Sequence, residues 1–179
     1  MAGVTAGRSL ADAASASDAV HIFGAEPYPY YPRPYLWRFI ADEMEQGDLY
    51  FQPLPWYEKK GIQFHIDTRV AAIDTGEHRL TLSGGQSLTY DRLLVATGAR
   101  PFVPPIEGVS KEGVFTLRTL EDALAIKAYA ADVSKAMVVG GGLLGLETAR
   151  ALHDGGLDTR VIEIADHLLP RQTDREGAH

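Results

Sequence analysis

The sequence predicts an α/β fold in which two incomplete βαβ units form three-layer, mostly parallel sheets beside a small antiparallel β element. Three observations support this prediction. A glycine-rich turn separates an apolar strand from a helix-like stretch within residues 136–163. A helix-like stretch followed by a short strand opens the chain at residues 2–24. Short alternating segments then fill residues 63–89, where strands joined by tight turns are expected.

The first 60 residues hold the second half of one βαβ unit. Residues 2–14 favour a helix, and Ala19 to Phe23 follow as a short strand closed by Gly24. The proline-rich and aromatic run 27–35 favours an extended surface path, because proline fixes φ. Helical signals return at residues 36–45 and 56–60.

The middle of the chain predicts short strands and then a linker. Strands are expected at 63–67, 69–73, 79–82 and 87–89, with Gly84-Gly85 as a hairpin turn. Residues 92–96 predict a short buried strand that ends at Thr97-Gly98. Three prolines in residues 100–108 indicate a linker. We therefore expect a boundary near residue 112, with domains at 1–112 and 113–179.

The strongest functional signal is the glycine-rich turn. An apolar strand, residues 136–139, runs into Gly140, Gly142 and Gly145; a helix follows, and a second strand ends at Glu163. The first glycine permits a tight turn, the second lets a pyrophosphate approach the backbone, and the third allows close helix–strand packing. This spacing predicts a Rossmann-like dinucleotide-binding unit.

Residues of the same unit predict which coenzyme, NADH or NADPH, would be preferred. Free amide N–H groups at the helix start, those of Leu143 and Leu144, would face the pyrophosphate. The carboxylate of Glu163 can accept hydrogen bonds from the adenosine ribose and would repel a 2′-phosphate. Residues 164–166 supply no cation, and Arg160 lies inside the strand. The sequence therefore favours NADH over NADPH.

Composition narrows the classes of function. The formal net charge of −7 argues against a surface for nucleic acid or an anionic membrane. The chain has no cysteine, which excludes a redox disulfide or a thiolate metal site within these residues. Its six histidines lack ligand spacing, so no metal site and no catalytic side chain are predicted. No leader or membrane-spanning segment is recognised, and a cytoplasmic location is the default expectation.

Four sequence blocks carry a resemblance to a known family. They are Phe23-Gly-Ala-Glu-Pro-Tyr with Tyr31-Pro-Arg-Pro, Ala96-Thr-Gly-Ala-Arg-Pro, Phe115-Thr-Leu-Arg-Thr-Leu-Glu-Asp-Ala, and the glycine motif with Leu168-Leu-Pro-Arg. With these blocks the chain resembles the FAD-dependent pyridine nucleotide-disulfide oxidoreductases from Ala2 to about Asp174. It is most similar to the branch of NADH–rubredoxin reductases, ferredoxin reductases and the flavin-bearing front of nitrite reductases.

The resemblance implies that the first unit binds FAD and the second binds NADH. The residues that match FAD-binding positions are Gly3, Glu26 (ribose), Arg33 (phosphates), Val70 (adenine), and Thr97, Gly98 and Arg100 (second flavin motif). Those that match NADH-binding positions are Gly140, Gly142, Gly145, Glu147 and Glu163. Glu147 could equally be an exposed helix residue. A lysine often found five positions after the arginine is replaced by Arg38.

The resemblance also implies a reaction and its partners. A hydride would pass from NADH to FAD, and electrons would go on to rubredoxin, ferredoxin, a haem or iron–sulfur domain, or a small acceptor. Family members extend beyond both ends of this sequence, so we expect a truncated form that binds FAD weakly and is inactive alone. Three interpretations stay open: part of a longer flavoprotein, a non-catalytic nucleotide-binding remnant, or a subunit completed in an oligomer by a partner chain.

Overall fold

The computed structural model describes residues 1–13, 15 and 18–178. The chain forms two compact units, each assembled from separate stretches. Unit 1 comprises Met1–Pro32 and Tyr50–Ala99, and unit 2 comprises Arg33–Leu49 and Arg100–His179. We describe each unit by itself.

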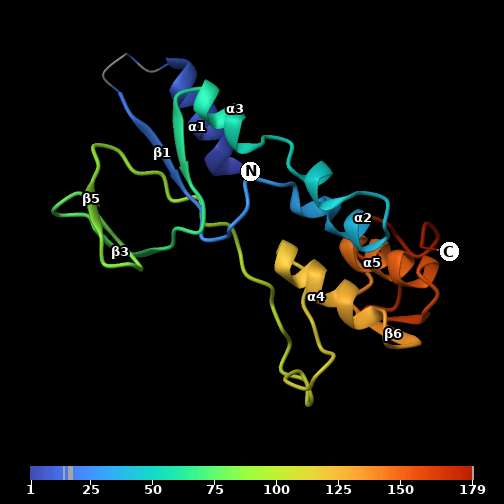
Figure 1. Ribbon diagram of the computed structural model, residues 1–179. Coiled ribbons are helices and arrows are strands. Elements are labelled where there is room, and N and C mark those ends of the chain that lie inside the picture. Colours follow the sequence, from blue (N-terminus) through green and yellow to red (C-terminus); the bar gives the residue numbers. More distant parts are fainter. Residues whose placement is uncertain (14, 16–17, 179) are drawn as a thin grey trace. The chain divides into compact units, whose positions relative to one another are not determined.

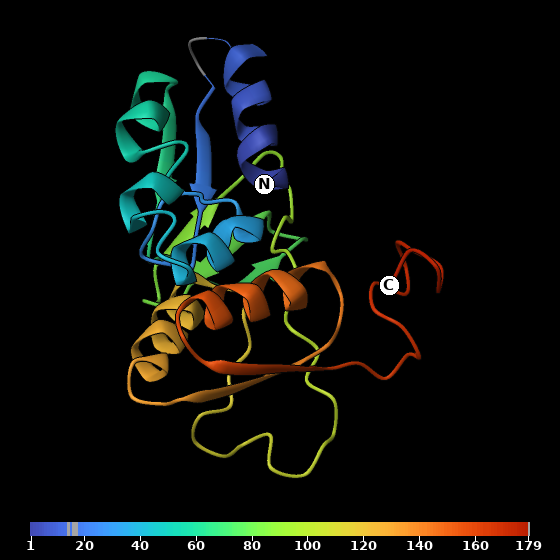
Figure 2. The same ribbon diagram turned by 90° about the vertical axis from the view of Figure 1, so that its right-hand side faces the viewer.

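Unit 1 contains a two-stranded parallel sheet covered by helices on one face (Figure 2). Strands β1 (Val20–Phe23) and β2 (Ile62–His65) pair so that Ile22 lies opposite Phe64. A Cβ atom at Gly7 of helix α1 (Ala2–Ala13) would lie 2.8 Å from Ile22 Cδ1, which shows how closely α1 approaches β1. Residue 14, the last of the predicted helix, lies outside the described residues.

Helix α3 (Leu54–Lys59) covers the same face of this sheet. The Tyr57 ring of α3 lies 4.8 Å from the Phe64 ring, measured between centroids. Tyr57 is only 1% exposed, and its burial raises the pKa of the hydroxyl to about 12. The opposite face carries stacked rings, with His65 between His21 and Phe23. Nδ1 of His21 and Nε2 of His65 lie 3.0 Å apart.

The antiparallel element has the predicted form. Strands β3 (Val70–Asp74), β4 (Arg79–Leu82) and β5 (Ser87–Thr89) form one sheet in that order. Gly85 has φ +84° in the turn between β4 and β5, a conformation that glycine adopts without strain. Leu80 and Leu82 are the buried members of this sheet. The hairpin predicted at Gly84-Gly85 is confirmed.

The predicted strand at residues 92–96 is wrong. This stretch is irregular, and within the described residues it pairs with no strand. Leu94 and Val95 are 59% and 61% exposed. An apolar run becomes a strand only when a neighbouring strand accepts its backbone hydrogen bonds, and none does so here.

Unit 2 begins with a short helix that is shorter than predicted. Helix α2 (Leu36–Ile40) follows the 3₁₀ turn η1 (Arg33–Tyr35) and precedes η2 (Gln46–Leu49). The predicted helix 36–45 ends early because Asp42 adopts φ +58°, in the left-handed region. The apolar side chains of α2, Leu36, Phe39 and Ile40, are buried, and α2 packs on helices α4 and α5.

Helix α4 (Leu120–Ala130) begins with a side-chain cap. Thr119 is its N-cap, and the Thr119 side chain accepts from the Asp122 amide at 3.1 Å. The Asp122 carboxylate accepts from the amides of Arg118 and Thr119 at 2.8 Å each. This capping box satisfies amides that the first helical turn leaves unpaired.

After α4, unit 2 continues with a βαβ unit (Figure 2), of which Figure 1 labels the first strand and the helix. Strands β6 (Lys135–Val139) and β7 (Asp158–Ile162) are parallel neighbours, joined by helix α5 (Leu143–Asp154). Val138 and Val161 lie opposite each other and are more buried than their neighbours, whereas Met137 and Val139 are exposed. The predicted α/β class, with parallel sheets and a small antiparallel sheet, is confirmed.

Candidate functional site

The three glycines of the motif have different structural roles. Gly140 has φ +115°, and its N–H donates to the carbonyl of Ile162 at 2.7 Å. A Cβ at Gly145 would lie 2.0 Å from the carbonyl oxygen of Gly140, a distance no side chain could accept. A Cβ at Gly142 would meet no heavy atom within 4 Å. Gly140 and Gly145 are therefore needed by the protein itself, and Gly142 leaves open space for a ligand.

Gly141 joins the turn to the chain that follows β7. Its N–H donates to Glu163 Oε2 at 2.7 Å, and its carbonyl accepts from the Leu169 amide at 2.9 Å. A Cβ at this position would lie 2.7 Å from Leu168 Cδ2. Gly141 is not among the residues predicted from the sequence, where the run of three glycines is its only signal.

Glu163 lies one residue past β7, beside the glycine turn. Its second oxygen, Oε1, accepts from the Ala165 amide at 2.9 Å. The amides of Ala165 and Gly141 hold the pKa of this carboxyl below its usual value. The carboxylate therefore stays ionised at neutral pH, and each oxygen keeps a lone pair that can accept from a ribose hydroxyl.

Helix α5 presents its N-terminus to the same place. Gly142 is its N-cap and offers no side chain, so the first amides, those of Leu143 and Leu144, have no partner within the helix. Such amides and the helix dipole together favour an anion. Open space over Gly142, free amides and an ionised carboxylate nearby fit the pyrophosphate and adenosine ribose of a dinucleotide.

Glu147 lies on α5 one turn further on. Its Oε2 pairs with Arg150 Nε at 3.4 Å. Arg150 also pairs with Glu43 at 3.1 Å and lies over the Trp37 ring, 4.7 Å from the centroid. Glu43 accepts in turn from Arg38 at 3.1 Å. The carboxylate of Glu147 is therefore engaged in a charged network, and its contact with NADH stays a prediction.

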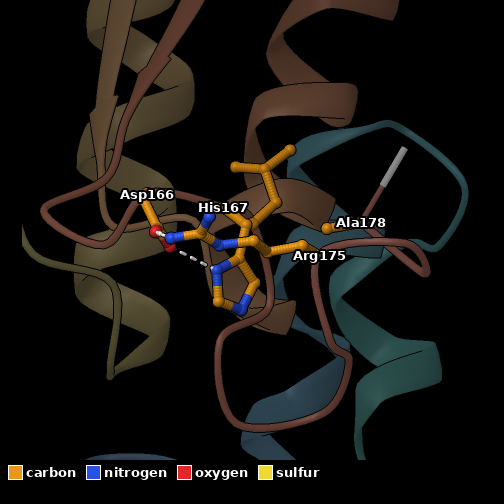
Figure 3. A pocket seen from close by; sticks show the side chains of 5 residues that line it. Asp166, His167, Arg175 and Ala178 are labelled. Carbon is orange, nitrogen blue, oxygen red and sulfur yellow. Dashed lines mark hydrogen bonds and ion pairs between the residues drawn. The ribbon is translucent and has the colours of Figure 1, made fainter.

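A cluster of charge follows Glu163 in the chain. The Asp166 carboxylate faces both His167 and Arg175 (Figure 3): one oxygen bonds His167 Nδ1 at 2.6 Å, and the other bonds the Arg175 guanidinium. These residues line a cavity of about 530 Å³. Residues 164–166 contain no cation, but the fold brings Arg175 to this place from nine residues beyond Asp166.

Unit 1 holds a second carboxylate at the end of a parallel strand. Glu26 follows β1, its side chain accepts from the Tyr31 hydroxyl, and its carbonyl accepts from the Asp67 amide at 2.8 Å. Tyr31 is buried. A Cβ at Gly3 in α1 would lie 3.3 Å from Ala96 Cβ, so α1 approaches residues 96–98 closely. This geometry fits the ribose end of a dinucleotide at Glu26.

The remaining predicted FAD residues are divided between the units. Val70 starts β3, and Thr97 and Gly98 lie in irregular backbone of unit 1, with Gly98 at φ +75°. Arg33 and Arg100 belong to unit 2. Arg33 Nη1 donates to the Arg118 carbonyl at 2.6 Å. Arg100 is exposed in an irregular stretch. Their roles toward FAD stay predictions.

Two searches of the described residues concern other kinds of site. No group of three or more His, Asp or Glu side chains in them could hold a metal ion. None of the helices they form combines the length and the apolar character that crossing a bilayer requires.

Comparison with known proteins identifies the family. The sequence profile of the pyridine nucleotide-disulphide oxidoreductases matches residues 1–178. The nitrite reductase [NAD(P)H] of Bacillus subtilis is 37% identical over 174 residues, which are 97% of this chain and 22% of the relative. The NADH-rubredoxin oxidoreductase of Clostridium acetobutylicum is 33% identical over 173 residues, which are 96% of this chain and 45% of the relative.

Solved structures agree with the sequence comparison. The NAD-dependent persulfide reductase from A. fulgidus superposes with a TM-score of 0.89 at 31% identity, over 99% of this chain and 35% of that one. The chain thus spans about a fifth of the nitrite reductase and less than half of the other two relatives. Members of this family are FAD flavoproteins that use NADH, and some relatives are named as NAD(P)H enzymes. The chain belongs to the pyridine nucleotide-disulphide oxidoreductase family.

Proposed function

We propose that unit 2 binds NADH at the glycine turn and that the chain serves a flavoprotein oxidoreductase. Such an enzyme would pass a hydride from NADH to bound FAD and electrons on to a protein or small acceptor. The observation that carries the proposal is the open space over Gly142 beside an ionised carboxylate, Glu163, which is bonded to the same turn. No neighbouring atom among the described residues requires a bare backbone at Gly142, since a Cβ there would meet nothing within 4 Å.

The residues of unit 2 would hold NADH by two groups of contacts. The pyrophosphate would lie over Gly142 and accept from the amides of Leu143 and Leu144. The adenosine ribose would donate both hydroxyls to Glu163. A 2′-phosphate at that position would meet a negative charge, which favours NADH over NADPH.

Unit 1 would hold the adenosine end of FAD. Glu26 would accept from the ribose hydroxyls, with the Tyr31 hydroxyl donating to the same carboxylate, and the N-terminal turn of α1 at Gly3 would lie near the phosphates. Bound FAD supplies the chemistry of accepting a hydride and releasing electrons. The protein's own side chains bind and orient the coenzymes, so the mechanism needs no acid or base from this chain.

The acceptor is proposed by analogy with the relatives. One relative is an NADH-rubredoxin oxidoreductase, and one similar structure is a putidaredoxin reductase–putidaredoxin complex at 28% identity. We propose an acceptor of the same kind, a small electron-transfer protein such as rubredoxin or a ferredoxin, or a haem or iron–sulfur domain.

The first experiment is a calorimetric titration of the full chain with NADH, NADPH and ADP-ribose. We expect NADH and ADP-ribose to bind with similar affinity, because both carry the ribose and pyrophosphate, and NADPH to bind more weakly. Absence of binding by all three would overturn the nucleotide site. A parallel titration with FAD tests unit 1 separately, since its outcome does not depend on the glycine turn of unit 2.

A further inference from the structure

The loop after β7 contains a cation that the structure ties to a carboxylate. One oxygen of Asp166 bonds the Arg175 guanidinium, and the other bonds His167 at 2.6 Å. Arg175 is 76% exposed at its side chain, so this ion pair, rather than packing, fixes where its charge lies. The Arg175 charge is therefore matched by Asp166 and is not offered to a ligand.

This cluster lies at the adenosine end of the proposed NADH site. Leu168, its neighbour in the chain, lies against Gly141, and Leu169 donates to the Gly141 carbonyl. Glu163, three residues before Asp166 in the chain, bonds the Gly141 amide of the same turn. The loop is thus anchored on the same turn that would hold the ribose, and Arg175 is attached to that loop through Asp166.

We propose that Asp166 determines coenzyme specificity by holding Arg175 away from the 2′-phosphate of NADPH, and that Arg175 can bind this phosphate once Asp166 is removed. The inference rests on the proposed NADH site and deepens it. Two carboxylates then disfavour NADPH. Glu163 repels the 2′-phosphate directly, and Asp166 pairs with Arg175, the cation that could otherwise bind this phosphate.

Physical chemistry supports a phosphate as the ligand of the released arginine. A guanidinium forms bidentate, charge-assisted hydrogen bonds with phosphate oxygens as readily as with a carboxylate. The cluster lines a cavity of about 530 Å³, which has room for a group the size of a phosphate. Removing Asp166 also takes one negative charge from the place where the phosphate would enter.

The test measures dissociation constants of the full chain for NADH and NADPH. For Asp166→Ala we expect the affinity for NADPH to rise about tenfold and that for NADH to change less than about twofold, since only NADPH gains a charge-assisted contact. Adenosine 2′,5′-bisphosphate and AMP, which differ only in the 2′-phosphate, should show the same difference. If Asp166→Ala does not fold, Asp166→Asn is measured in the same way.

A matched control separates the specific effect from a general change of charge. Asp174 lies in the same segment, but it accepts from the Gly177 amide at 2.9 Å. Asp174→Ala changes the net charge by the same amount and should leave the ratio of the NADPH affinity to the NADH affinity within about twofold of the wild-type ratio. The double variant Asp166→Ala with Arg175→Ala should lose the gain in NADPH affinity.

The outcomes distinguish the inference from the proposed function. If the wild-type chain binds neither NADH nor NADPH, the nucleotide site itself is wrong. If it binds NADH and Asp166→Ala leaves the ratio unchanged, only the role of Asp166 is wrong. A gain that persists without Arg175, or that Asp174→Ala reproduces, also overturns this role.

Discussion

Gly142 and Gly145 show that two glycines of one motif can be required for opposite reasons. The space around Gly142 is open, whereas a side chain at Gly145 would overlap the Gly140 carbonyl oxygen at 2.0 Å. We expect Gly142→Val to abolish NADH binding and to cost at most about 1 kcal/mol of stability, because valine is a poorer N-cap than glycine. Calorimetric titration and urea denaturation measure these two quantities.

The matched variant at the third glycine should behave differently. Gly145→Ala should lower the free energy of unfolding by about 3 kcal/mol or more, because the added methyl group meets rigid backbone. If Gly142→Val keeps full NADH affinity, or unfolds the chain as Gly145→Ala should, the assignment of Gly142 to the ligand is wrong.

Glu163 links stability to pH in a defined direction. Its pKa is lowered by the amides of Ala165 and Gly141, so its contribution is fully present above the ordinary glutamate pKa of about 4.5. That contribution is lost as the pH falls through the lower pKa of the folded state. We expect acid unfolding below about pH 4.5 to be less steep in Glu163→Gln than in wild type, as followed by circular dichroism. Equal slopes would contradict the hydrogen bonds to this carboxylate.

The sequence could predict that Glu163 follows its strand, but not that it bonds Gly141. Spacing along the chain fixes where a strand ends. A contact across 22 residues depends on how the turn and the loop fold back. Arg175 was missed for the same reason, because no local pattern connects it with Asp166.

Among the elements, α4 depends on its N-terminal cap. The side chains of Thr119 and Asp122 each accept a hydrogen bond from the backbone amide of the other residue. We expect Thr119→Ala to lower the free energy of unfolding by about 1 kcal/mol, the usual effect of losing such a cap. Thr119→Ser keeps the accepting oxygen and should stay close to wild type. Urea denaturation of both variants provides the measurement, and equal loss in both would show that the threonine methyl group matters instead.

The sequence predicted the elements that local chemistry specifies. The hairpin at Gly84-Gly85 and the βαβ unit around Gly140 both have signals within a few residues. It failed for residues 92–96, where apolar character was present but no pairing strand was. It also could not show that α2 packs on α4 and α5, since those partners lie more than 80 residues away.

For the whole molecule, the two units should respond differently to NADH. At about 100 times its dissociation constant, a ligand stabilises the folded state by about 2.7 kcal/mol. Amides at residues 139–146 and 163–169, which surround the glycine turn, should then exchange with solvent up to about 100-fold more slowly. Amides of β3, β4 and β5 in unit 1 should not change. Hydrogen exchange with mass spectrometry provides this map, and uniform protection would place the site elsewhere.

The division of unit 2 into two stretches has a consequence for dissecting the molecule. The polypeptide passes between the units after Pro32, after Leu49 and after Ala99. No single cut can therefore release either unit with all of its parts. A fragment ending near residue 112 would carry α2 away from the helices that bury Leu36 and Phe39, and the remaining fragment would expose their partners. Isolating unit 2 in folded form calls for a rearranged gene that joins residues 33–49 directly to residues 100–179, and isolating unit 1 calls for one that joins residues 1–32 to residues 50–99.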